Sequence, residues 1–125
     1  MRSIYLSVLA GFLATGAAWC HHSLAAEFDQ SKPVNITGAV TSIDWRNPHA
    51  WIYLDVKDEA GKVVKWQCEL GSPNQMARSG WKQDSVKIGE EIIVAGILAK
   101  DGTNTCSTRN VKYKDGRTVF SQGGR

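Results

Sequence analysis

Hydrophobic and polar residues alternate along much of the chain after residue 33, which predicts strands rather than helices. In the segment VNITGAVTSIDW (34–45), the apolar positions share one face up to Val40 and the opposite face from Ile43 onward. Such a change of phase, in a run that contains Gly38, is typical of a bulge or a sharp bend in a barrel strand. The Asn-Pro pair in RNPH then favours a turn that ends this strand.

Two further alternating segments follow, and the turn KDEAGK joins them into a predicted hairpin. In AWIYLDV we expect Ala50 and Ile52 to face the core, while Trp51 and Tyr53 point outward. The segment VVKWQCEL carries four residues on one face: Val64, Trp66, Cys68 and Leu70.

A short helix and two more strand regions complete the pattern. Ser72 is a good N-cap and Pro73 fits the first helical position, so we expect a helix to begin there. The nearly all-apolar run 92–99 predicts a strand that is covered on both sides. Farther along, KDGR predicts a tight turn between short strands at 111–113 and 118–120.

The order of these elements indicates an all-β fold with one short helix. A meander of three strands, a helix and two more strands is the order of a five-stranded OB-like barrel. We expect the barrel to occupy residues 34–121, with an open six-stranded meander or a small sandwich as the alternative. In such a barrel the third and fifth strands are neighbours, and Cys68 and Cys106 fall at those two places.

The first 20 residues have the pattern of a cleaved signal peptide. Arg2 precedes an apolar stretch that ends in the small residues Gly16, Ala17 and Ala18. The stretch is too short and too poorly flanked for a stable membrane span, although a retained anchor is the alternative. We therefore expect residues 21–33 to form a polar N-terminal segment of a protein in the periplasm or secreted, without a transmembrane span after cleavage.

If the protein is exported, its cysteines are exposed to an oxidising compartment in which disulfides form. Cys68 and Cys106 are the only pair in the expected barrel, and two cysteines in an oxidising compartment most often join each other. A disulfide between them would close a loop of roughly forty residues and stabilise the fold by about 4 kcal/mol. Two separately buried thiols are the alternative.

The charge pattern narrows the class of partner. The 125 residues carry a formal net charge of +3, and charges of both signs alternate along the chain. The long blocks of Lys and Arg that are typical of nucleic-acid or membrane-surface binding are missing from the sequence. We therefore expect no nucleic-acid partner.

Three histidines are the candidate metal ligands: His21, His22 and His49. Cleavage after Cys20 would make His21 the N-terminus, whose α-amine and imidazole suit Cu(II). Cleavage after Ala18 would place a histidine third, an arrangement that favours square-planar Cu(II) or Ni(II).

The third histidine lies in WRNPHAW, a turn that borders the ligand-binding face of OB barrels. If the N-terminal segment folds back over this rim, the three histidines converge on one metal ion. Copper is the metal that we expect first. Glu27, Asp29 or Glu69 would then supply an oxygen ligand or orient an imidazole. The alternatives are a solvated HHS segment with His49 as an ordinary turn residue, or cleavage after Ala25, which removes both leading histidines.

A second candidate site is an aromatic face. Its expected ligand-binding residues are Trp45, Asn47, Trp51, Tyr53, Glu69 and Asn74. On an OB face, outward-pointing rings stack on bases or sugars, and export favours a glycan, a small ligand or an envelope protein partner. The alternative is that these rings serve packing.

Catalysis is not expected from these residues. Ser72, His49 and Asp55 form no nucleophile elbow or ordered triad in the sequence. Cys68 is expected to be buried and paired, and therefore inert. We predict that the protein is not an enzyme.

Several short motifs together resemble a bacterial family. The segments HHSLAAEFD, WRNPHAWIYLDV, ELGSPN, SGW and KDG are similar to small exported proteins of domain of unknown function 6152. The chain departs from the family pattern at Leu24, where Phe is usual, and in KIGEE, where Pro and Asp are commoner. The resemblance implies export and a compact β-rich domain, and it brings no activity or catalytic residue.

The sequence thus predicts a small exported β-barrel that binds something rather than transforms it. The first hypothesis is a periplasmic copper-binding protein that uses the three histidines. The second is an OB-like module that binds a glycan, small ligand or partner protein through its aromatic face. The third is an interaction protein without a small ligand.

Overall fold

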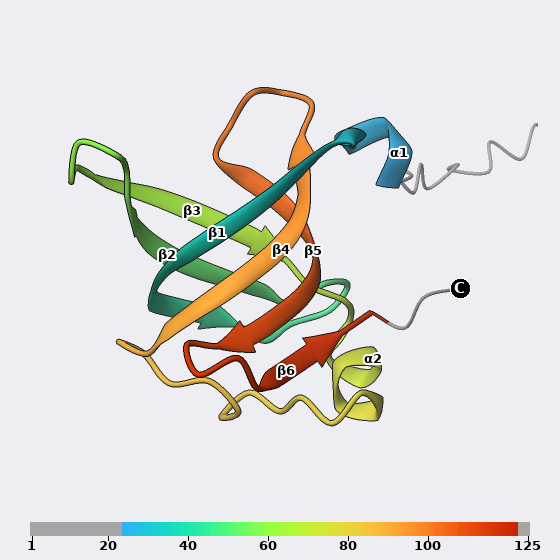
Figure 1. Ribbon diagram of the computed structural model, residues 1–125. Helices are drawn as coiled ribbons and strands as arrows, with labels where there is room; N and C mark the ends of the chain where they lie inside the picture. Colours follow the sequence, from blue (N-terminus) through green and yellow to red (C-terminus); the bar gives the residue numbers. More distant parts are fainter. Residues whose placement is uncertain (1–23, 123–125) are drawn as a thin grey trace, which may run out of the picture.

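Strands dominate the computed structural model, which describes residues 24–122 (Figure 1). The elements in chain order are α1 (Leu24–Glu27), β1 (Phe28–Asp44), β2 (Trp51–Lys57), β3 (Val63–Glu69), α2 (Pro73–Arg78), β4 (Glu91–Ala99), β5 (Thr105–Tyr113) and β6 (Thr118–Ser121).

The strands form one sheet that closes on itself. Their order is β3-β2-β1-β4-β5-β6, and a further parallel pairing of β3 with β5 completes a ring of five strands. The sixth strand, β6, extends the sheet beyond β5 through the hairpin that KDGR predicts. The predicted all-β fold with a five-stranded barrel is confirmed, and the β3–β5 pairing distinguishes it from an open meander.

The long first strand bends where the hydrophobic phase changes. Its register against β2 shifts between Val40, which pairs with Leu54, and Ser42, which pairs with Tyr53. A register shift of this kind is a bulge, and it turns the following side chains to the other face. Gly38 permits close approach nearby, because a Cβ there would lie 2.6 Å from the carbonyl oxygen of Asp55.

The strand β1 starts at Phe28 rather than near residue 34, so the expected polar lead-in is partly structured. Phe28 is buried with Ile97 and Ala99 of β4, and its Cα pairs with that of Ala99. The register against β4 is irregular between Phe28 and Pro33. Mostly exposed polar residues fill this irregular stretch, which is why alternation did not predict it.

The helix α2 begins where its sequence predicts. The hydroxyl of Ser72 accepts a hydrogen bond from the backbone N–H of Gln75 at 3.2 Å, and Pro73 opens the helix. The helix buries Met76, and Trp81 after it is fully buried as well. Trp81 packs between Trp45, with ring centroids 6.4 Å apart, and Phe120, at 5.8 Å.

The barrel interior holds the main hydrophobic core. Its members come from the five strands of the ring, from α2 and from the segment that follows α2 in the chain. The largest fully buried side chains include Trp81, Ile52, Leu54, Met76, Ile92 and Val94. Ile52 and Leu54 are buried as the alternation of β2 predicts, while Trp51 and Tyr53 are half-buried on the opposite face.

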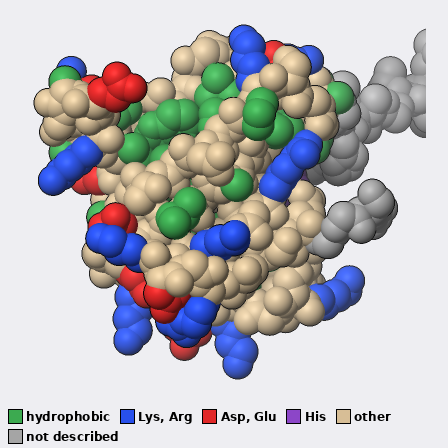
Figure 2. Space-filling view, viewed as in Figure 1, with side chains coloured by type: hydrophobic (Ala, Val, Ile, Leu, Met, Phe, Trp, Pro, Cys, Tyr) green, Lys and Arg blue, Asp and Glu red, His purple; other side chains and the backbone are tan. Residues whose placement is uncertain are grey.

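The surface mixes charges of both signs. On the face in Figure 2, lysines, arginines and acidic residues are interspersed, and hydrophobic side chains gather between the β2–β3 hairpin and the β4–β5 loop. None of the helices in residues 24–122 has the length and apolar character that crossing a bilayer requires.

Candidate functional site

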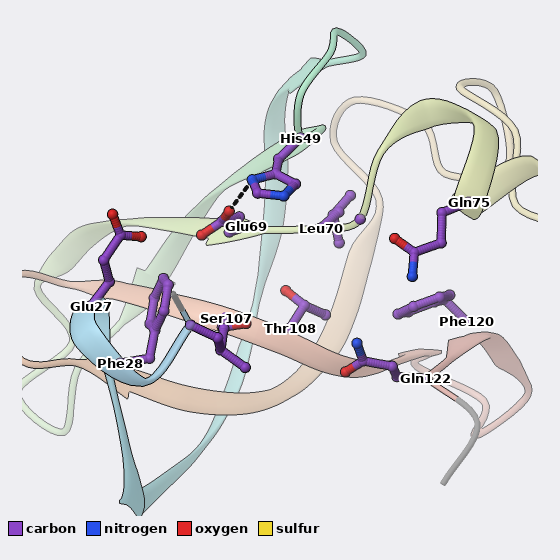
Figure 3. A pocket seen from close by; sticks show the side chains of 12 residues that line it. Glu27, Phe28, His49, Glu69, Leu70, Gln75, Ser107, Thr108, Phe120 and Gln122 are labelled. Atoms are coloured by element: carbon purple, nitrogen blue, oxygen red, sulfur yellow. Dashed lines mark ion pairs between the residues drawn. The ribbon is translucent and has the colours of Figure 1, made fainter. Parts of the chain in front are cut away.

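A cavity of about 290 Å³ lies between α1, the turn before β2, the end of β3 and the first half of β5. Its lining includes Leu24, Glu27, His49, Glu69, Gln75 and Thr108. Figure 3 shows how side chains from these separate segments surround the same space. We call this cavity the rim pocket.

His49 and Glu69 form an ion pair at the rim pocket, the one drawn in Figure 3. The contact joins Nδ1 of His49 to Oε1 of Glu69. Half of the His49 side chain is exposed (52%), whereas only 11% of the Glu69 side chain is. The imidazole is therefore accessible to a ligand, while the carboxylate is held inside.

The backbone places these two side chains together. Glu69 ends β3 directly opposite Trp51, the first residue of β2. Ala50 continues the pairing beyond the strands, because its N–H donates to the carbonyl of Gly71 at 2.9 Å and its carbonyl accepts from the N–H of Leu70 at 2.8 Å. The turn that carries His49 is thus tied to the segment after β3.

Burial raises the pKa of Glu69 above its ordinary value of 4.5. The nearby charge of His49 opposes this shift, and the charge of Glu27 reinforces it. A second carboxylate close by and partial loss of water both make the negative charge on Glu69 costly. A positive charge placed in the rim pocket relieves that cost.

The N-terminal helix α1 is attached beside the rim pocket. The N–H of Lys100 donates to the carbonyl of Glu27 at 2.9 Å, and its Nζ donates to the carbonyl of Ala25 at 2.6 Å. Phe28 then anchors the chain by burial. These contacts hold Leu24 and Glu27 where they line the rim pocket.

The predicted metal ligands are only partly within the described residues. His21 and His22 lie outside residues 24–122, so their convergence with His49 stays a prediction. Within that range no group of three or more His, Cys, Asp or Glu is arranged to hold a metal ion. Glu27 and Glu69 share the rim pocket with His49, whereas Asp29 accepts hydrogen bonds from Ser31 instead.

The predicted aromatic residues divide into two groups. Trp51 and Tyr53 point outward on β2 as expected, whereas Trp45 packs against Trp81. Asn47 and Asn74 are exposed, and neither lines the rim pocket.

A second hollow of about 670 Å³ adjoins the rim pocket. The two share Glu27, Phe28 and Glu69, and the second hollow extends to Trp51 and Lys100. It also includes Gln67 and Thr105, which are not among the residues predicted from the sequence. Gln67 lies opposite Tyr53. The alternation of β3 already predicts that its side chain points outward.

Cys68 and Cys106 are direct partners in the parallel β3–β5 pairing. Both are completely buried free thiols in this structure, so the disulfide stays a prediction. The hydrogen-bonding contact with the Cys106 thiol, together with burial, raises the pKa of Cys68. The same contact lowers the pKa of Cys106.

Comparison with known proteins gives one family match. Residues 10–108 match the model of a family described as a family of unknown function (DUF6152). The matched range includes the rim pocket pair His49–Glu69 and extends into β5. No curated protein and no solved structure matches the chain.

Proposed function

The chain belongs to the family of unknown function DUF6152. We propose that it is an exported binding protein that holds a transition-metal ion at the rim pocket, and that this ion is copper. The observation that carries the proposal is that Leu24 and Glu27 line the same cavity as His49 and Glu69. The segment that directly follows His21 and His22 in the sequence therefore ends at the cavity that contains the third histidine.

The reach of the chain supports this arrangement. His22 precedes Leu24 by two residues, and an extended chain advances at most about 3.6 Å per residue. The backbone of His22 is therefore within about 7 Å of that of Leu24 in any conformation. An imidazole at position 22 is long enough to meet an ion in the rim pocket.

The contact between His49 and Glu69 suits a metal ligand. Ligating histidines usually donate one ring N–H to a carboxylate, which fixes the tautomer and leaves the other nitrogen for the metal. Here Glu69 holds Nδ1, so Nε2 of His49 is the nitrogen we assign to the metal. Glu69 would act as the orienting carboxylate, and Glu27 would add compensating negative charge.

Copper fits this donor set better than the other common ions. Three imidazoles and a terminal amine favour Cu(II), which binds nitrogen ligands most strongly among the divalent first-row metals. Cleavage after Cys20 or Ala18 supplies both an amine and the leading histidines to the exported chain. We infer that the protein binds the ion without transforming a substrate.

The experiment begins with the full chain, expressed with its leader in a Gram-negative host and recovered from the envelope. Intact mass defines the mature N-terminus, and Cu(II) titration with electron paramagnetic resonance measures affinity and counts the coordinated nitrogens. We expect one tightly bound Cu(II), and His49→Ala is expected to lose one coordinated nitrogen. Glu69→Gln is expected to weaken affinity about 10- to 100-fold, because the orienting carboxylate is lost.

Glu59→Gln is the matched control, because Glu59 is an exposed glutamate in the β2–β3 turn. We expect this variant to bind copper as the wild type does. A mature chain that begins at Ala26 would overturn the proposal, because both leading histidines would then be absent. Unchanged copper affinity in His49→Ala would overturn it as well.

A further inference from the structure

The outer face of the β2–β3 hairpin presents two aromatic rings side by side. Trp51 and Tyr53 are two residues apart on β2 and lie on the same face, about 6.6 Å apart along the strand. Their partners across the hairpin on β3 are Glu69 and Gln67. The result is a floor with the two rings on β2 and polar side chains opposite them on β3.

Two neighbouring hollows lie along this floor. The larger, about 670 Å³, contains Trp51, and a smaller one of about 260 Å³ contains Tyr53. Gln67 and Thr105 line both hollows, so the two adjoin. We call this the hairpin groove; its principal residues are Trp51, Tyr53, Gln67, Thr103, Asn104 and Thr105.

Amide and hydroxyl groups form the wall of the hairpin groove. Nε2 of Gln67 donates to the Thr105 hydroxyl at 2.9 Å, and the hydroxyls of Thr103 and Thr105 are hydrogen-bonded to each other at 2.8 Å. These bonds fix the orientation of the Gln67 amide and direct its oxygen elsewhere as an acceptor. Asn104, beside them, adds an amide that both donates and accepts. Such groups match sugar hydroxyls, which also donate and accept.

The charges at the hairpin groove disfavour a polyanion. Three carboxylates line its Trp51 end, those of Glu27, Glu69 and Asp101, against the single ammonium group of Lys100. At the other end, the Lys65 ammonium already pairs with Asp55 at 3.3 Å. Nucleic acids and acidic polysaccharides need an excess of positive charge that these described side chains do not supply.

The backbone of the floor disfavours an extended peptide. The strands β2 and β3 pair along their whole length, from Trp51–Glu69 to Lys57–Val63. Beside Gln67 and Glu69, β3 is also paired with β5. The floor around Gln67 therefore has no free strand edge to which a peptide could add as a further strand.

From this combination we propose that the hairpin groove binds a neutral oligosaccharide, whose sugar rings stack on Trp51 and Tyr53. OB-like barrels are suited to such ligands because their second and third strands offer an open, gently curved surface. The site goes beyond the proposed metal site and does not depend on it. The rim pocket and the hairpin groove share three lining residues, Glu27, Phe28 and Glu69.

The test is calorimetric titration of the metal-free mature protein with three neutral probes. These are the β-1,4-linked hexamers of N-acetylglucosamine and of glucose, and the α-1,4-linked hexamer of glucose. We expect at least one of them to bind, and Trp51→Ala and Tyr53→Ala each to weaken that binding by about tenfold or more, because one stacking ring is lost. Trp51→Phe keeps a ring and is expected to retain most of the affinity.

Two controls distinguish the loss of a stacking ring in the groove from the loss of a packed tryptophan elsewhere and from the loss of the metal site. Trp45→Ala removes a tryptophan that packs against Trp81, and sugar binding is expected to be unchanged. His49→Ala is likewise expected to bind the sugar normally, while Trp51→Ala is expected to bind copper normally. Failure of the metal proposal and failure of the sugar proposal therefore give different patterns.

Three outcomes would overturn the proposal. The first is that none of the three hexasaccharides binds. The second is that Trp51→Ala and Tyr53→Ala, shown by circular dichroism to be folded, bind the sugar as tightly as the wild type. The third is that heparin or a single-stranded oligonucleotide binds the groove more tightly than any neutral probe.

Discussion

Cys68 and Cys106 lie directly opposite each other where β3 and β5 pair in parallel, at the seam that closes the barrel. Only three residue pairs make up this seam, and the cysteines are the middle pair. Neighbouring strands are about 4.8 Å apart, which is within the Cα separation that a disulfide spans. The seam is therefore the place where a covalent bond would most directly secure the ring.

We predict that the protein forms a Cys68–Cys106 disulfide in an oxidising compartment. Oxidation is expected to raise the free energy of unfolding by about 4 kcal/mol, because the bond restricts the unfolded chain. Urea denaturation with and without reductant measures the difference, and peptide mapping under non-reducing conditions identifies the bond.

The control for this prediction is the double variant Cys68→Ala/Cys106→Ala, whose stability should not respond to reductant. If peptide mapping instead shows two free thiols after exposure to a glutathione redox buffer, the two cysteines serve packing alone. The free thiols of the present structure would then describe the mature protein as well.

The closeness of the two cysteines was predictable because strand order fixes it. Alternation located the first three strands and an apolar run located β4, and the OB-like order made the third and fifth strands neighbours. The start of β5 was not located, because the polar segment before Val111 reads as a loop, whereas the strand begins at Thr105. The early start of β1 was not predictable in this way, because polar residues between Phe28 and Val34 hide the alternation. That stretch forms part of a strand only because β4 lies beside it.

Gly38→Ala is expected to destabilise the barrel by about 1–3 kcal/mol, because the added methyl overpacks a tight crossing. Its Cβ would lie 2.6 Å from the carbonyl oxygen of Asp55 and 2.9 Å from Cγ2 of Val56. Urea denaturation of the variant measures the loss. Asn35→Ala, at an exposed position of the same strand, is the control, and an equal loss there would mean that crowding at Gly38 is not the cause.

Trp45 is expected to contribute to stability rather than to ligand binding. Its ring packs against the buried Trp81 with centroids 6.4 Å apart, so Trp45→Ala should lower the free energy of unfolding by about 2 kcal/mol. Copper and sugar affinities should stay as in the wild type. If the variant has normal stability but does not bind the sugar, Trp45 is a ligand-binding residue instead.

The division between Trp45 and Trp51 marks the limit of what the sequence reveals about the site. Alternation predicts that Trp51 points outward, and it does. Trp45 follows the bulge at the end of β1, and its partner Trp81 lies far along the chain, so only the tertiary structure brings them together. The same holds for Lys100, which reaches the site because the β4–β5 loop meets α1.

Glu69 is expected to make stability depend on pH in a direction that can be checked. Its pKa is raised in the folded protein, mainly by burial, so the folded state holds this proton more tightly than the unfolded chain does. As pH rises above about 4.5, the unfolded chain loses the proton first, and the free energy of unfolding falls until Glu69 is ionised in the folded state as well. Urea denaturation of metal-free wild type and Glu69→Gln from pH 4 to 7 should show the wild type losing stability relative to the variant over this window. In a His49→Ala background the fall should move to higher pH, because the charge of His49 lowers the pKa of Glu69. A wild-type advantage that grows with pH would mean that the folded protein favours the ionised carboxylate, contrary to its burial.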